Sequence, residues 1–317
     1  MRGTRVETAS RRGIKLAGAS TARAWRYRWP SSGRVALAVG LLLIALSVLV
    51  PLLWLLFSSF KGPDEFYSPI PTLLPMNPTL ANYEYMWTQM ANVQLYLRNS
   101  FLIAFGSVIV QVTCAALAGY AFARMEFRGR DLIFLGLLIS MFIPRSGGLM
   151  ALYELMHALH LRNSPIGLIL LFGASIPLPT FIMRQTFLSL PRELEDAARV
   201  DGAGWLAVFW RIALPLSTSG MIVIAILCFV GVWGDFLITY TMIDHDDWLT
   251  LSVGVQKVLI QQRNVAQFTV AREWLGRFAT EAADAALLIL ALLPVVTLYA
   301  LLQRWFVRGL TEGVLKF

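Results

Sequence analysis

Long runs of apolar residues with almost no charge inside them constrain this chain more than any other feature. Of its 317 residues, 57% are hydrophobic and only 15% are charged, whereas soluble domains carry about 25% charged residues. An apolar run of about 20 residues forms a helix that crosses the roughly 30 Å hydrocarbon core of a bilayer. The sequence therefore predicts an all-α integral membrane protein.

Six such runs predict six transmembrane helices. Several contain proline, which membrane helices tolerate when neighbouring helices satisfy the freed carbonyl groups. An amphipathic stretch, 149–161, is predicted to lie along the membrane interface. The six predicted helices cover roughly 34–60, 99–123, 131 to beyond Pro144, 165–183, 216–242 and 282–303.

The remaining segments are polar. Residues 1–33 are basic and predict a cytoplasmic extension ahead of a six-helix domain, 34–317. Two adjacent arginines there are typical of an export signal, but the apolar stretch behind them is too short for one. Residues 61–97 and 243–280 are expected to form external loops, the first with little regular structure.

Charge sets the expected orientation. If the N-terminus is inside, 19 of the 27 basic residues fall on inner segments and 8 on outer segments or helix ends. Positive charge gathers on the cytoplasmic side of membrane proteins, so both termini are predicted to be cytoplasmic. The net charge of +8 forms no basic stripe with interleaved aromatic residues, and we expect no nucleic-acid partner.

Cysteine and histidine give no sign of a disulfide, metal or cofactor site. Cys114 and Cys228 both lie inside apolar runs and are expected to be small buried residues. His157 and His160 are three residues apart, but a zinc site needs more ligands than the sequence places nearby. We therefore expect no bound metal and no cofactor.

The longest internal polar segment, 184–215, has the pattern of two short helices. Pro191, followed by Glu193 and Glu195, favours a helix start, because proline suits the first turn and acidic groups suit the positive end of the helix dipole. The pair Asp201-Gly202 predicts its end. An amphipathic, aromatic-rich stretch at 204–213 predicts the second helix.

Small side chains on the first of these helices let another surface come close. Such a helix, lying on the cytoplasmic side between two membrane spans, suits docking into a groove of a partner protein. An ordinary interfacial connector is the alternative interpretation.

The same segment contains an extended motif. Permeases of ATP-binding-cassette (ABC) importers carry Glu-Ala-Ala, three residues, Gly, nine residues, Ile, one residue and Leu-Pro. Every spacing fits this chain, and the one departure, aspartate for glutamate, keeps the carboxylate and shortens its reach. The matching residues are Asp196, Ala197, Ala198, Gly202, Ile212, Leu214 and Pro215.

The chain therefore resembles the permeases of binding-protein-dependent transport systems, and in particular the maltose-permease-G-like branch that serves carbohydrate importers. The resemblance covers a core of about 95–310. The stretches that carry it are 96–104, 118–131, 190–203 and 303–316.

This resemblance implies a type I ABC importer permease fold, in a bacterial cytoplasmic membrane, with sugar as cargo. It implies a second permease subunit, two ATPase subunits and an extracytoplasmic solute-binding protein as partners. It also implies that the loop 184–215 holds a coupling helix that inserts into a cleft on the ATPase. The residues expected to make this contact are Glu195, Asp196, Ala197, Ala198, Asp201 and Gly202.

The chain itself is not expected to be an enzyme. No Gly-Lys-Ser/Thr occurs anywhere, so a P-loop is excluded and the energy would come from the partner ATPase. Polar residues beside or within predicted spans are candidates for the substrate pathway, with bundle packing as the alternative. These candidates are Asn99, Ser100, Trp233 and Asp235.

Two other functions stay open at this point. The same machinery could carry glycerol-3-phosphate or another polar solute, but anionic cargo favours basic pocket residues, and only Arg98 and Arg145 are candidates. An ion-coupled secondary transporter often has internal repeats and ionisable groups at the membrane midplane, and neither is evident.

Overall fold

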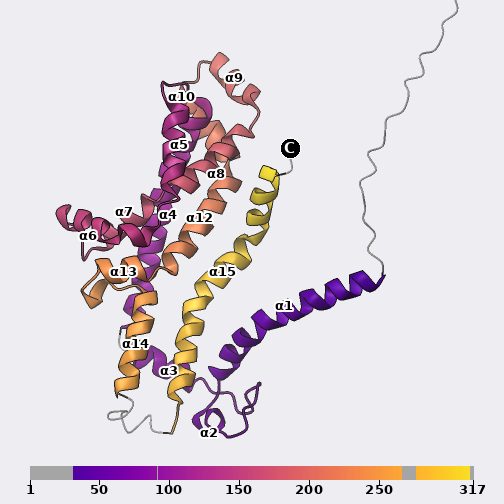
Figure 1. Cartoon of the computed structure of the whole chain (residues 1–317), viewed down its shortest axis with the longest axis vertical. Coiled ribbons are helices and arrows are strands. Elements are labelled where there is room, and N and C mark those ends of the chain that lie inside the picture. The colour runs from indigo at the N-terminus through magenta and orange to yellow at the C-terminus, as the bar shows by residue number, and fades with distance from the viewer. Residues whose placement is uncertain (1–30, 91, 266–275, 315–317) are drawn as a thin grey trace, which may run out of the picture. The chain divides into compact units, whose positions relative to one another are not determined.

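The computed structural model describes residues 31–90, 92–265 and 276–314, and most of these residues fold into helices (Figure 1). The only strand-like pairing among them is an isolated bridge between Lys61 and Pro78. The chain divides into two compact units, Met1–Pro51 and Leu52–Phe317, the second of which we call the core unit. Residues 1–30, which hold most of the predicted basic extension, lie outside the described residues.

The first predicted span is confirmed as a helix, α1 (Ser31–Ser58), with Pro51 inside it. Its apolar part, Val35–Ser58, is long enough to cross a bilayer.

Helix α4 (Val93–Arg124) is the centre of the core unit and begins six residues before the predicted start at Asn99. It packs against α7 (Pro165–Gly173), α8 (Pro177–Leu188) and α12 (Thr218–Trp233). Small residues on α4 allow these close approaches, as they do between many membrane helices. Helix α15 (Thr280–Val314) contains the predicted sixth span, with Pro294 inside, and packs on α12.

Proline and local breaks divide several predicted spans. The prediction that the third span runs through Pro144 is wrong, because α5 (Arg130–Ser140) ends before this proline, which cannot continue a helix without losing a backbone hydrogen bond. The fourth span is two helices, α7 and α8, bent by 49°. The predicted 216–242 span is α12 followed by α13 (Leu237–Met242).

Within the described residues, three helices are long and apolar enough to span a membrane, or five if each bent pair counts as one span. The second bent pair is Trp205–Leu216 with Thr218–Trp233, at 73°. The predicted count of six therefore stays a prediction.

Both predicted external loops contain more helix than expected. The segment 61–97 includes α2 (Pro63–Phe66), α3 (Ala81–Thr88) and the start of α4. The segment 243–280 includes η3 (Asp246–Trp248) and α14 (Leu251–Val265). Helix α14 packs on α4 and α15, so its stability comes from tertiary contacts that local composition does not reveal.

Two short helices follow α5, and the two cysteines lie on α4 and α12. Helix α6 (Leu149–Ala158) follows η1 (Arg145–Gly148) and lies within the amphipathic stretch 149–161, whose position along the membrane interface stays a prediction. Both cysteines are free, and Cys228 is buried as expected. Cys114 is exposed on α4, so the prediction that it is buried is wrong: an apolar run does not say which face of a membrane helix is covered.

The contact between α4 and α8 gives a stability prediction. A side-chain carbon at Gly119 would lie 2.5 Å from Met183 Cβ and 3.0 Å from the Arg184 backbone nitrogen, so Gly119→Ala must push two helices apart. We expect a loss of about 1–3 kcal/mol, seen as a lower melting temperature of the purified protein in detergent. Gly136→Ala, which would meet no atom within 4 Å, is the control and should not destabilise the protein. Equal melting temperatures for the two variants would contradict the close approach.

Candidate functional site

The candidate site is built on α9 (Arg192–Val200), one turn after the end of α8. Pro191 precedes it, Glu193 and Glu195 lie in its first turn, and Asp201 follows its last residue, as the sequence predicted. Gly202 has a φ of +83°, a left-handed conformation that favours glycine. The chain reverses direction there. The Gly202 N–H donates to the Arg199 carbonyl, and the Ala203 N–H donates to the Ala198 carbonyl.

One side of α9 is unpartnered within the described chain. Asp196 and Ala197 are exposed, and Ala198 is half-buried. Val200 is 88% exposed and Leu194 is also exposed, which leaves apolar surface uncovered at the end of the core unit (Figure 1). Asp201 and Gly202 are exposed as well.

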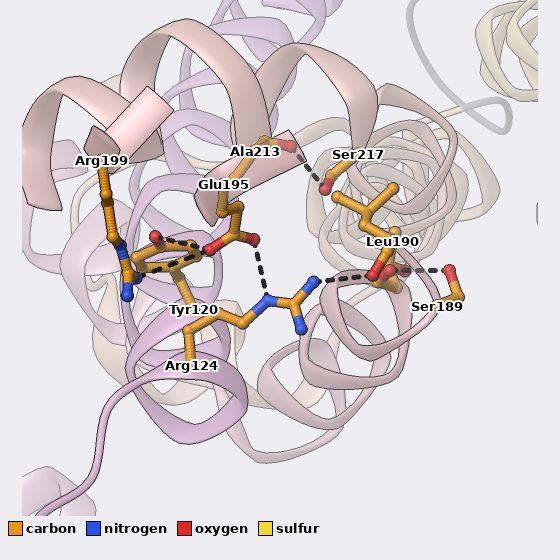
Figure 2. A network of polar contacts seen from close by, with 9 residues as sticks. Tyr120, Arg124, Ser189, Leu190, Glu195, Arg199, Ala213 and Ser217 are labelled. Carbon is orange, nitrogen blue, oxygen red and sulfur yellow. Dashed lines mark hydrogen bonds and ion pairs between the residues drawn. The ribbon is translucent and has the colours of Figure 1, made fainter. Parts of the chain in front are cut away.

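Glu195 is the one buried residue of α9, and it faces the chain's own interior. Its Oε1 lies 2.8 Å from Arg124 Nε, and the two side chains are only 5% and 4% exposed. The Tyr120 hydroxyl donates to Glu195 Oε2 at 3.2 Å, and an Arg199 nitrogen lies 3.9 Å from the same oxygen. Figure 2 shows the carboxylate between these groups.

Arg124 joins three segments. It is the last residue of α4, where a cation is favoured by the helix dipole. Its Nε reaches α9 through Glu195, and its Nη2 donates to the Leu190 carbonyl at 2.8 Å, just after α8 (Figure 2). Because a guanidinium is planar and rigid, it fixes the ends of α4 and α8 relative to α9.

The second predicted helix of the segment is also present. It consists of α10 (Trp205–Val208) and a π-helical turn, η2 (Phe209–Ala213), which leads into α11 (Leu214–Leu216). Pro215 lies four residues after Arg211 and has no N–H to donate to the Arg211 carbonyl. This missing hydrogen bond accounts for the irregular turn. Phe209 packs 5.1 Å from the Tyr120 ring, and the Arg199 guanidinium lies 3.6 Å from the Trp205 ring centre.

The polar candidates on α4 make contacts inside the chain. Asn99 is buried and donates to the carbonyls of Asp247 and Leu249, at 2.8 and 3.1 Å. Ser100 is buried and accepts the Leu251 N–H at 2.7 Å. Both residues therefore attach α4 to the segment that leads into α14.

The two candidates on the fifth span also make internal contacts. Trp233 is buried, and its Nε1 donates to the Ala291 carbonyl at 2.9 Å on α15. Asp235 Oδ1 accepts the N–H groups of Ile238 and Thr239, both at 3.1 Å, and so caps the start of α13.

None of these four residues lines the cavities of about 610 and 360 Å³ that open on the described part of the chain. Their contacts are those that bundle packing requires. A role in the substrate pathway stays a prediction for them.

Sequence reasoning missed the partners that hold Glu195. Arg124 and Tyr120 entered the sequence analysis only as members of the matching stretch 118–131. They are separated from Glu195 by 71 and 75 positions, so no local pattern pairs them. Among the described residues, no three His, Cys, Asp or Glu side chains come together as a possible metal site.

Comparisons with known proteins show the family to which the chain belongs. The model of the family called binding-protein-dependent transport system inner membrane component matches residues 16–312. The chain belongs to this family. It is thus a membrane permease, a transport subunit.

Curated relatives of this permease include several sugar-system proteins. A sulfoquinovosyl glycerol transport permease from Agrobacterium fabrum is 32% identical over 286 residues, 90% of this chain and 95% of that protein. A galactooligosaccharides transport permease from Bacillus subtilis is 32% identical over 277 residues, 86% and 92% of the two chains. A maltodextrin transport permease from the same organism is 36% identical over 228 residues, 70% and 76% of the two chains.

A solved structure has the same fold. One chain in the crystal structure of a bacterial ABC transporter involved in the import of the acidic polysaccharide alginate matches with a TM-score of 0.76. The match covers 88% of this permease and 99% of that chain, at 20% identity.

The buried ion pair predicts a measurable coupling. Arg124→Ala leaves the Glu195 carboxylate buried without its partner, which costs about 3–5 kcal/mol. The double variant Arg124→Ala/Glu195→Ala should lose much less than the sum of the two single variants. Melting temperatures in detergent measure this difference.

An exposed pair provides the matched control. Arg130 Nε lies 3.1 Å from Asp131 Oδ1, with side chains 31% and 78% exposed. Arg130→Ala should therefore cost less than about 1 kcal/mol. Additive losses at Arg124 and Glu195 would show that the two side chains do not interact.

Proposed function

We propose that this permease carries sugar inward as the membrane subunit of an ATP-driven importer, with α9 as its coupling helix. The observation that carries the proposal is the arrangement of α9. One side is exposed and built of short or apolar side chains, whereas Glu195 on the other side is held by Arg124. Such a helix offers a docking face and has a rigid attachment to the bundle.

Short side chains on the exposed side suit insertion into a cleft. Ala197 and Asp196 leave room for close approach, and Leu194 and Val200 provide apolar surface that a partner would cover. The proposed partner for this face is an ATPase subunit, since the permease has no P-loop of its own.

The attachment offers a route for force. A displacement of α9 would pull on Glu195, then on Arg124 and the Leu190 carbonyl, and so on the ends of α4 and α8. Since α4 packs along α7, α8 and α12, their rearrangement would open the bundle to one side or the other of the membrane.

Sugar is proposed as cargo because curated relatives are named as permeases for galactooligosaccharides and maltodextrin.

We further propose a second permease subunit, two ATPase subunits and an extracytoplasmic solute-binding protein as partners. The proposed location is a bacterial cytoplasmic membrane with both termini inside. The contact between Arg124 and Glu195 requires the end of α4 and α9 to lie on the same side of the membrane. The excess of basic residues on that side is what favours its being cytoplasmic.

The conformation of Gly202 supplies the test. Gly202→Val forces a branched side chain into a left-handed conformation, at a cost of about 1–3 kcal/mol, and should distort the end of α9. We expect ATP-driven uptake to fall by about tenfold or more while membrane insertion is unchanged. Uptake is measured in vesicles containing the full transporter, with whichever radiolabelled maltodextrin or galactooligosaccharide the wild-type complex imports.

A neighbouring glycine is the control. At both Gly202 and Gly204 an added carbon would meet no atom within 4 Å, but Gly204 has a φ of −71°, which valine adopts readily. Gly204→Val should therefore retain uptake. Normal uptake with Gly202→Val would count against the coupling role of α9.

A further inference from the structure

A cavity of about 360 Å³ opens where the fourth span breaks between α7 and α8. Residues from α4, the end of α5, the break itself and α12 line it. Its polar lining consists of Gln111, Ser140 and Ser175, whereas Gly231 and Cys228 lie on the α12 side. Its volume is in the range of small-molecule sites, about 300–1,000 Å³.

The cavity lies far from the end of α4 that carries Arg124, at a depth within the membrane. Gln111 is 13 residues before Arg124 on the continuous helix α4, which places it about 20 Å from that end at 1.5 Å per residue. Its Nε2 donates to the Phe172 carbonyl at 3.3 Å and to the Ser175 carbonyl at 2.8 Å. The Phe172 carbonyl also accepts the Ser175 N–H at 3.1 Å. Pro179 has no N–H to donate to the Ser175 carbonyl, so the amide of Gln111 supplies a donor that the helix break removes.

A polar break at this depth is incompatible with a lipid-facing surface. Irregular backbone occurs at membrane depth only where protein buries it or where it lines a water-filled cavity. Here the cavity reaches the surface of the chain, since Ser140 and Gly231 on its lining are exposed. Broken helices of this kind commonly form substrate sites in transporters.

We infer that this cavity is the permease's own contribution to the translocation pathway and that it contacts the hydroxyl groups of a neutral sugar. The inference rests on the proposed function, and it places the pathway apart from Asn99, Ser100, Trp233 and Asp235. None of the described residues that line the cavity carries a charge. An anionic solute would favour cationic partners there.

The donors and acceptors fit hydroxyl groups. The Gln111 amide nitrogen is used by the two carbonyl groups, so its Oε1 is the atom that can accept from a ligand. The Ser140 hydroxyl donates to the Leu137 carbonyl at 2.7 Å, which leaves its oxygen as an acceptor as well. Sugar hydroxyls are donors that match both atoms.

The experiment measures access of water to Gly231. Cys114 and Cys228 are first replaced by serine and alanine, and Gly231→Cys is introduced, because an added carbon there meets no atom within 4 Å. Gly136→Cys on α5 is the matched control. An added carbon at Gly136 also meets no atom within 4 Å, but Gly136 does not line the cavity. The full transporter in vesicles is treated with a positively charged, membrane-impermeant methanethiosulfonate reagent, with and without ATP and vanadate.

We expect the thiol at position 231 to react at least about tenfold faster than the thiol at 136, because the reactive thiolate forms in water and not in lipid. Its rate should also change when ATP and vanadate trap the complex. An unreactive thiol at 231 in both states, or equal rates at the two positions, would overturn the inference. If Gly231→Cys does not assemble, Ser140→Cys against Ile139→Cys makes the same comparison on α5.

A second variant tests passage of the sugar. Gly231→Phe should fill the cavity and lower sugar uptake by about tenfold or more, whereas Gly136→Phe should not. Unchanged uptake with Gly231→Phe would contradict a pathway at this site. If only the coupling proposal is wrong, the thiol at position 231 should still react faster than the thiol at 136 in the absence of nucleotide. The coupling proposal is tested separately, by sugar uptake with Gly202→Val.

Discussion

The ion pair between Glu195 and Arg124 is the contact on which the proposed mechanism depends. A carboxylate and a guanidinium are costly to bury, and they stay buried only when each has its hydrogen-bond partners. Here Tyr120 and the Leu190 carbonyl provide them. This contact holds one face of α9 against the helix bundle. The opposite face of α9 therefore stays exposed and available for a partner protein.

Irregular helices are the second constraint. A bundle of straight apolar helices would offer no polar group at membrane depth, whereas the bend of 49° between α7 and α8 frees backbone carbonyls there. Gln111 on α4 donates to the carbonyl of Ser175, whose helical donor position is Pro179, and to that of Phe172. The central helix thus carries an ion pair at one end and an amide that stabilises the break in its middle, which links the proposed coupling site to the proposed sugar pathway.

Sequence patterns predicted much of this organisation and missed its tertiary details. The bounds of α9 followed from Pro191, the first-turn carboxylates and Gly202, because these signals act within a few residues. The helix α14 and the exposure of Cys114 depend on neighbours distant in sequence. Asn99 and Ser100 were recognisable as polar, but their partners at 247–251 were not.

The most direct test is whether α9 moves together with the end of α4. Spin labels at Arg192, the first residue of α9, and at Arg128, just after α4, are both exposed and lie outside the proposed docking residues. They report this separation in the assembled transporter by pulsed electron paramagnetic resonance, without nucleotide and with ATP and vanadate. The account predicts the same distance in both states and a broadened distribution once Arg124 is replaced by alanine. A distance that changes between the two states in the otherwise intact protein would contradict it.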